Sequence, residues 1–406
     1  MPGNWAVICG LVRDPAAALH QASVLAQFRG EGLIQGVVIS TWERELDRYR
    51  EVRRAFKALD AWVITSREPT LKGPGHVLHQ SKAILLGLDA CPADAMVLKM
   101  RFDLAPLDGH IWPILTGERL AAQEQRAKPN VFSRPVMAHG GLMFWPFFLN
   151  DIYYYGARSD LQMLSRYDIQ TEVFYNELGA EQCFHLPPFA RRYPSLSLFA
   201  RIQKVLEAGR VANNRRYAEI LLQSDLWYRV WAIYAKAQLE DYYVGMIEES
   251  RTLAPAVLDQ YRNIAMGELL DVGGSAPFLH ASPIAGSLEV HSASWALAAV
   301  EGMFKPDAVG ERFRDAYAAI SAGDDLPDSA TFPHASAVEL AEKISAAFPD
   351  YAHRICTQPP DKRKRRLSFP PERLVSDLQQ DTRELELQVA EFRRLHQQAL
   401  IAAGRP

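Results

Sequence analysis

The first hundred residues of this chain predict an α/β fold built around a parallel sheet. Two observations support that prediction: several short runs are apolar along their whole length, and longer segments with helical patterning separate them. Strands that are apolar throughout are typical of a sheet covered on both faces, which is how parallel sheets occur in proteins. The predicted strands cover residues 5–12, 36–41, 61–65 and 95–100, and the predicted helices cover 15–29, 43–59 and 75–88.

Local signals justify these elements in chain order. Asp14 followed by Pro15 is a typical helix start, because an aspartate caps the first amides and proline fits the first helical position. The next strand, 36–41, is compact and rich in β-branched residues, and the segment 43–59 after it is charged and amphipathic. Sheets of this kind bind ligands beyond the carboxyl ends of their strands.

The remainder of the chain changes character after the predicted sheet. Residues 135–155 are dense in aromatic side chains, and strand-like runs are found around 141–148 and 152–156. Ser159 or Asp160 is expected to cap a helix that runs to Tyr167. We therefore divide the chain into a sheet domain at 1–190, a mostly helical region at 191–323, a linker with a basic run at 324–371 and a helical tail at 372–406.

Composition and charge exclude several classes of protein. Hydrophobic residues make up 48% of the 406 residues and charged residues 23%, which is ordinary globular composition. The net charge of −3 provides no general attraction for nucleic acid, so we expect no nucleic-acid partner. The four cysteines are far apart and form no C-x-x-C pair, which indicates neither a disulfide framework nor a zinc knuckle and fits a reducing compartment.

Two further patterns are missing from the sequence. The start lacks the basic segment of a signal peptide, and the longest apolar stretch, 141–149, is far short of the ~20 residues that span a bilayer. We therefore expect a cytoplasmic protein whose membrane contact, at the inner membrane, is at most peripheral. The sequence also has no P-loop and no G-x-G-x-x-G motif, which disfavours kinase, ATPase and NAD chemistry.

The sharpest candidate for chemistry is the strand end Lys99-Met100-Arg101-Phe102-Asp103. It brings two basic residues and one carboxylate to the edge where a nucleotide-sugar donor would present its diphosphate. Mg²⁺ or Mn²⁺ would bridge the phosphates and take one or two carboxylates from the protein, and an arginine would add a charge-assisted bond to phosphate. By itself this pattern is also compatible with an ion pair on the protein surface.

Several short motifs in the same order resemble the WavE-type lipopolysaccharide synthesis proteins, a GT-A-like glycosyltransferase family. The resemblance covers roughly residues 5 to 190, less than half of the chain. One departure is that Leu78-His79 stands where the family has Asn-Arg before glutamine, so a donor contact made by that arginine would be lost or changed. The similar stretches are Val37–Glu43, Gln80 with Gly87-Leu88, Val97–Asp103, Asn150–Asp160 and Glu181-Gln182.

The resemblance implies roles for residues near the donor. Asp103 is the implied metal ligand, with Arg101 and Lys99 near phosphate, although a solvated charge at the strand end is the alternative for Lys99. Thr41 and Trp42 lie on the ligand edge, where Trp42 either stacks on a base or sugar or fills a gap between helix and sheet. Gln80 completes the residues expected to bind the donor.

It also implies roles on the acceptor side. Glu181 is the implied general base that removes the proton of the acceptor hydroxyl, and a surface glutamate is the alternative. Asp151 is expected beside the donor pocket, either in acceptor binding or as the cap of a turn.

The histidines do not predict a metal site. His76 and His79 lie three residues apart on one predicted helix, but no third metal ligand stands at a diagnostic spacing.

The C-terminal segments suggest partners. Residues 372–406 contain about three heptads with β-branched residues and leucines, which favours a parallel homodimer, unless the helix packs on its own protein. The basic run 362–366 is expected either to contact anionic lipid or to remain a solvated linker.

Together these observations predict a glycosyltransferase that moves a sugar from a nucleotide-sugar donor to a lipopolysaccharide or another surface polysaccharide, with Mn²⁺ or Mg²⁺ as cofactor. Two alternatives remain open. One is a sugar-phosphate nucleotidyltransferase, for which Gly10–Asp14 would be a poor version of the expected glycine-rich loop. The other is a non-catalytic partner in glycan assembly.

Overall fold

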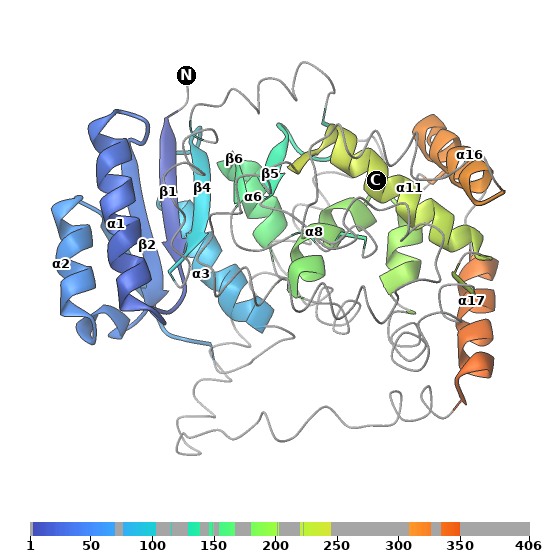
Figure 1. The fold of residues 1–406 in the computed structure, drawn as a ribbon, viewed down its shortest axis with the longest axis horizontal. Coiled ribbons are helices and arrows are strands. Elements are labelled where there is room, and N and C mark those ends of the chain that lie inside the picture. Colours follow the sequence, from blue (N-terminus) through green and yellow to red (C-terminus); the bar gives the residue numbers. More distant parts are fainter. Residues whose placement is uncertain are drawn as a thin grey trace, which may run out of the picture.

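A computed structural model of the chain describes residues 3–69, 76–102, 129–138, 154–166, 180–200, 223–244, 308–325 and 334–349, together with single positions between them. These residues form a mixed α/β fold around one seven-stranded sheet (Figure 1). The strands are β1 (Asn4–Cys9), β2 (Gly36–Trp42), β3 (Trp62–Ser66), β4 (Met96–Arg101), β5 (Val136–Ala138), β6 (Tyr154–Ala157) and β7 (Tyr242–Val244). The helices are α1 (Pro15–Gly30), η1 (Glu45–Asp47), α2 (Arg50–Ala58), α3 (Val77–Asp89), α6 (Arg158–Ser165), α8 (Ala180–Ala190), α11 (Asp225–Glu240), α16 (Ala308–Ala322) and α17 (His334–Ala347).

The four predicted strands are present and form the parallel part of the sheet. β1 pairs in parallel with β2 and β4, and β2 pairs in parallel with β3. Successive residues of β1 serve two cores, because side chains alternate between the faces of a strand. Ala6 and Ile8 belong to the core under α1 and α2, whereas Val7 and Cys9 belong to the larger core that contains α3 and α8.

The other part of the sheet makes it mixed. The strand order is β3-β2-β1-β4-β6-β5-β7, and β6 runs antiparallel to both of its neighbours, β4 and β5. β7 pairs in parallel with β5, so β6 is the one antiparallel strand among the seven. Since β7 comes from the stretch expected to be mostly helical, that stretch also supplies an edge strand to the sheet.

The capping prediction for the first helix is confirmed, and the prediction for the next helix needs correction. Asp14 Oδ1 accepts the amides of Ala16 and Ala17 at 2.9 and 3.2 Å. The helix expected over 43–59 is instead divided into η1 and α2, because Tyr49, which lies just before α2, has a non-helical backbone with φ of −124° and ψ of 66°.

Asp160 also differs from its expected role as a helix cap. α6 already begins at Arg158, and the Asp160 carboxylate accepts the amides of Ser133 and Arg134 at 2.9 and 3.1 Å and the Ser133 hydroxyl at 2.7 Å. Through these hydrogen bonds Asp160 connects α6 to the segment before β5.

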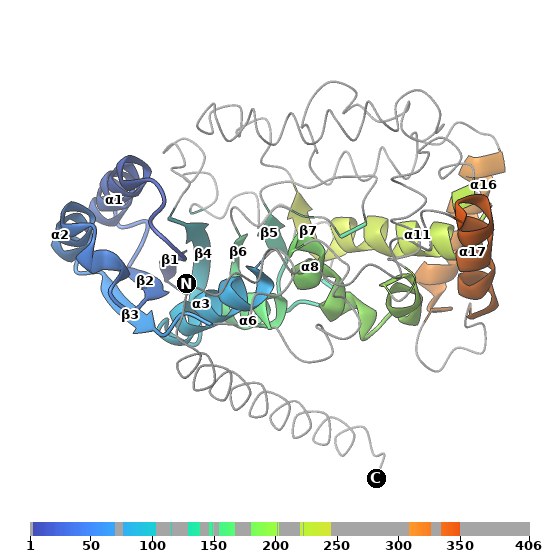
Figure 2. The ribbon, with the colours of Figure 1, turned by 90° about the horizontal axis from the view of Figure 1, so that it is seen from below.

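Helices α11, α16 and α17 lie at the opposite end of the molecule from α1 and α2 (Figures 1 and 2). α17 lies inside the segment expected to be a linker. It is a helix because Ala337, Leu340, Ile344 and Phe348 recur at helical spacing and are buried. Among the described residues, no helix is long and apolar enough to cross a bilayer. The basic run and the heptad tail lie outside the described residues.

Candidate functional site

The candidate site is the edge of the sheet at which the parallel strands end. β2 and β3 lie on one side of β1 and β4 lies on the other, so the order of the strands reverses between β1 and β4. In open α/β sheets, ligands bind in the crevice outside the carboxyl ends of the strands at such a switch point. Here those ends are Cys9 and Arg101, which are direct register partners.

The turn that follows β1 contains Gly10. This glycine has φ of +98°, a backbone conformation that residues with a Cβ rarely adopt. No described atom lies within 4 Å of the position that a Cβ would take there. The Gly10 amide donates to the carbonyl of Ser40 at 3.1 Å, and the Thr41 hydroxyl Oγ1 donates to the carbonyl of Gly10 at 2.7 Å. The turn is therefore held by β2, and none of the described atoms covers its Cβ position.

A second contact joins the segments that follow β1 and β2. It involves Glu45, which was not among the residues predicted for the site. Its side chain is buried, and Oε1 accepts the amide of Val12 at 3.0 Å. Arg48 Nη1 lies 4.0 Å from the other carboxylate oxygen. Nothing in the local sequence distinguishes Glu45 from the other charged residues of 43–59, since its role depends on the turn after β1.

Arg101 is the last residue of β4, on the other side of the switch point. The Gln21 side chain, from α1, donates to the Arg101 carbonyl at 2.5 Å. The amide of Phe102 donates to the carbonyl of Cys9 at 3.3 Å. Arg101 is partly exposed. Asp103, the predicted metal ligand, lies outside the described residues.

Lys99 shares a face of β4 with Arg101 but lies in the interior. Its side chain is 1% exposed, and Nζ is 4.6 Å from the ring centre of Tyr154. The alternative of a solvated charge at the strand end is therefore wrong for Lys99.

The other predicted donor-binding residues lie around the same edge. Thr41 is buried, and its hydroxyl donates to the carbonyl of Gly10. Trp42 is 5% exposed and meets the ring of His79 edge-on, with centroids 5.8 Å apart, as the packing alternative expects. Gln80 follows His79 in the first turn of α3 and is half-buried. These residues line the end of β2 and the start of α3, both next to the switch point.

His76, just before α3, and His79, in its first turn, have neighbouring rings. The rings of His76 and His79 are 5.5 Å apart, and His79 Nε2 lies 3.6 Å from a carboxylate oxygen of Glu68. Within the described part of the chain, no group of three or more histidine, cysteine, aspartate or glutamate side chains is arranged to hold a metal ion.

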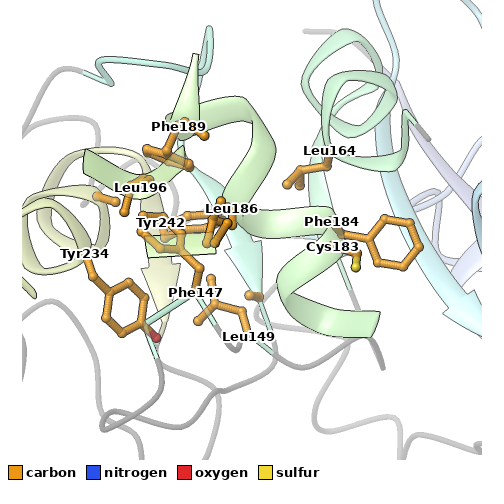
Figure 3. Packing of buried hydrophobic residues seen from close by; sticks show 14 of the residues in the cluster. Phe147, Leu149, Leu164, Cys183, Phe184, Leu186, Phe189, Leu196, Tyr234 and Tyr242 are labelled. Atoms are coloured by element: carbon orange, nitrogen blue, oxygen red, sulfur yellow. The ribbon is translucent and has the colours of Figure 1, made fainter. Parts of the chain in front are cut away.

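The predicted catalytic carboxylates are only partly placed. Glu181 lies in the first turn of α8, and the structure describes its backbone but not its side chain. Asp151 lies outside the described residues. α8 itself is well anchored, since Gln182 Nε2 donates to the carbonyl of Pro146 at 2.8 Å and the ring of Phe189 stacks on Tyr242 (Figure 3).

This edge has features that suit a phosphorylated ligand. A glycine turn without described atoms near its Cβ position allows a ligand to approach the backbone closely, and Arg101, which is partly exposed, ends the strand on the other side of the switch point. Comparison with protein-family models and with curated proteins finds no match to the chain.

Proposed function

We propose that the chain is a metal-dependent glycosyltransferase that moves a sugar from a nucleotide donor to a lipopolysaccharide or another surface polysaccharide. The observation that carries the proposal is the turn at Gly10, which has no described atom within 4 Å of its Cβ position and lies across the switch point from Arg101, the last residue of β4. The choice of acceptor rests on the family resemblance of the sequence.

The topology supports the finer proposal that the sheet is GT-A-like. A parallel half, β3-β2-β1-β4, lies beside a half that contains the antiparallel strand β6, and such a mixed sheet is compatible with a GT-A-like domain. In this proposal the nucleotide binds beyond the end of β2, near Thr41 and Trp42, and Gln80 of α3 contributes to the same site. In this proposal Arg101 binds the diphosphate through charge-assisted hydrogen bonds.

The proposed cofactor is Mn²⁺ or Mg²⁺, held by Asp103 together with the donor phosphates. The support for this assignment is the sequence, in which the carboxylate of Asp103 follows two residues after Arg101, the last residue of β4. Mg²⁺-type sites commonly use only one or two protein carboxylates besides phosphate oxygens. When bound, the metal would supply Lewis-acid stabilisation of the departing nucleoside diphosphate.

In this proposal Glu181 removes the proton of the acceptor hydroxyl while that oxygen attacks the anomeric carbon, and the nucleoside diphosphate leaves. A carboxylate suits this task when partial burial raises its basicity. Asp151 binds the acceptor. α8 contacts β6 through the rings of His185 and Tyr154, and this contact supports a stable position for the helix that carries Glu181.

A thermal-shift screen tests the proposal. The wild-type protein is heated with UDP, GDP or ADP, with the matching nucleotide sugars, and with nucleoside triphosphates, each with and without Mn²⁺. A ligand at a hundred times its Kd should stabilise the fold by ~2.7 kcal/mol. Stabilisation by a nucleotide sugar that requires Mn²⁺ supports the proposal. Preference for a triphosphate would indicate a nucleotidyltransferase, and no response to any nucleotide would favour the non-catalytic partner.

A further inference from the structure

Lys99 is a charged side chain in the interior of the protein, two residues before the end of β4. Lysine is almost never fully buried without a compensating contact, because removal of its ammonium from water is costly. The exposure of Lys99 is only 1%, whereas Arg101, on the same face of the strand, is partly exposed. The two basic residues of the strand therefore have different surroundings, which indicates different roles.

A row of side chains leads from Lys99 to α8. Tyr154 is the cross-strand partner of Lys99 in β6, and its ring faces the ammonium at 4.6 Å, a favourable cation–π geometry. The ring of His185, in α8, meets Tyr154 edge-on at 5.1 Å. His185 Nδ1 then lies 3.0 Å from the hydroxyl of Tyr242 in β7. The row thus connects α8 with three strands of the sheet.

The row carries one positive charge, on Lys99. His185 is fully buried, and this desolvation, together with the charge of Lys99, lowers its pKa to about 3. A neutral imidazole can pack near an ammonium group without repulsion. The same contacts would be unfavourable for a charged imidazole, so the neutral state of His185 is part of the packing.

We propose that Lys99 is a positioning residue that fixes the first half of α8 against the sheet, and that it does not contact the donor phosphates. The proposal rests on the proposed function, because α8 carries the predicted base, Glu181, one turn before His185. The second half of α8 contacts the sheet in another way: the ring of Phe189 stacks on that of Tyr242 in β7, with centroids 5.6 Å apart (Figure 3).

The first experiment separates a positioning role from phosphate binding. Lys99→Met removes the charge but keeps an unbranched apolar chain, and exchange of a buried charge for an apolar side chain is often tolerated. Arg101→Met is the matched control at the open edge. Calorimetry measures the affinity for UDP, GDP and ADP with Mn²⁺, and release of nucleoside diphosphate from the matching nucleotide sugars measures turnover.

We expect Lys99→Met to keep the wild-type nucleotide affinity and to lose about 10²-fold in kcat, since a displacement of ~1 Å at a catalytic group has about that effect. Arg101→Met should instead weaken nucleotide binding. If Lys99→Met weakens nucleotide binding as much as Arg101→Met does, Lys99 is a phosphate contact and the proposal is wrong.

The second experiment does not depend on any nucleotide. Nuclear magnetic resonance of ¹⁵N-histidine protein, with the His185 signals assigned through His185→Gln, should show a shifted ring and a higher pKa for His185 in Lys99→Met. Tyr154→Leu, which removes the ring between them, should also shift the signals, whereas the control Tyr154→Phe should not. Unchanged His185 signals in Lys99→Met would overturn the proposal. If the wild type binds no nucleotide, the proposed function fails, and these signals still decide whether Lys99 positions α8.

Discussion

The hydroxyl of Thr41 donates a 2.7 Å hydrogen bond to the carbonyl oxygen of Gly10 and thereby joins the ends of β1 and β2 at the candidate site. Thr41→Val keeps the shape of the side chain and leaves that carbonyl without this donor. We expect a loss of ~1–3 kcal/mol in the free energy of unfolding and weaker nucleotide binding. Chemical denaturation measures the first effect and calorimetry the second. Thr41→Ser retains the hydroxyl and should stay close to wild type in both measurements.

Gly10→Ala tests whether the turn over β1 is a binding surface. A left-handed backbone should cost alanine ~1–2 kcal/mol in the free energy of unfolding, and the new methyl group would occupy the room above the turn. The matched control is Gly32→Ala, because Gly32 also has positive φ, at +74°, and no described atom lies within 4 Å of its would-be Cβ. Both variants should lose stability, and only Gly10→Ala should lose nucleotide affinity. Equal affinities in the two variants would remove Gly10 from the site.

Asp241 predicts a pH dependence of stability. Its Oδ1 accepts the amides of Asn130, Val131 and Phe132 at 2.8, 2.6 and 3.1 Å. These bonds favour the carboxylate, but desolvation by burial outweighs them and raises the pKa of Asp241 to about 6. A raised pKa means that the folded state holds the proton more tightly than the unfolded chain does. The stabilising contribution is therefore present below the ordinary pKa of 3.8 and is lost as the pH rises through about 6.

Two variants of Asp241 check this expectation in urea titrations from pH 4 to 7. Asp241→Asn can keep all three amide bonds through its carbonyl oxygen and cannot titrate, so the part of the pH dependence due to this group should vanish. Asp241→Ala leaves three amides without their acceptor and should cost about 3 kcal/mol or more at every pH. An unchanged pH profile in Asp241→Asn would contradict the assignment.

Glu181→Gln tests the proposed base, since glutamine keeps the size of the side chain and removes its basicity. General-base catalysis is typically worth ~10²–10⁴ in rate, so turnover of the nucleotide sugar should fall by about that factor. Nucleotide affinity should stay at the wild-type value, because the base acts on the acceptor proton in the transition state. Turnover near the wild-type rate would exclude Glu181, and Asp151 or Glu177 would then be the next candidates.

The helices and strands that were predicted correctly are those whose formation is determined by residues within the element or next to it in the sequence. Asp14 and Pro15 determine the start of α1 through capping and a fixed φ, and the apolar runs of β1, β2 and β4 are sufficient to predict buried parallel strands. The strands that were missed, β5 and β7, have three residues each and exist only through pairing with distant segments.

The site was less predictable because its geometry depends on long-range contacts. The resemblance indicated Thr41, Trp42 and Arg101, and in the structure these residues lie at the carboxyl ends of β2 and β4, on either side of β1. Lys99 packs on the ring of Tyr154, and Glu45 accepts the amide of Val12. No pattern within either segment contains that information.

The most direct test of the proposed function is a calorimetric titration of the wild type and of Asp103→Asn with the nucleoside diphosphate that stabilises the wild type most among UDP, GDP and ADP. Each titration is carried out in Mn²⁺ and again in chelator. We predict that Mn²⁺ strengthens binding to the wild type and has no effect on Asp103→Asn, while both proteins unfold at similar temperatures. Equal metal-dependent affinity in both proteins would contradict the metal assignment, and a wild type that binds no nucleotide under either condition would contradict the proposed function.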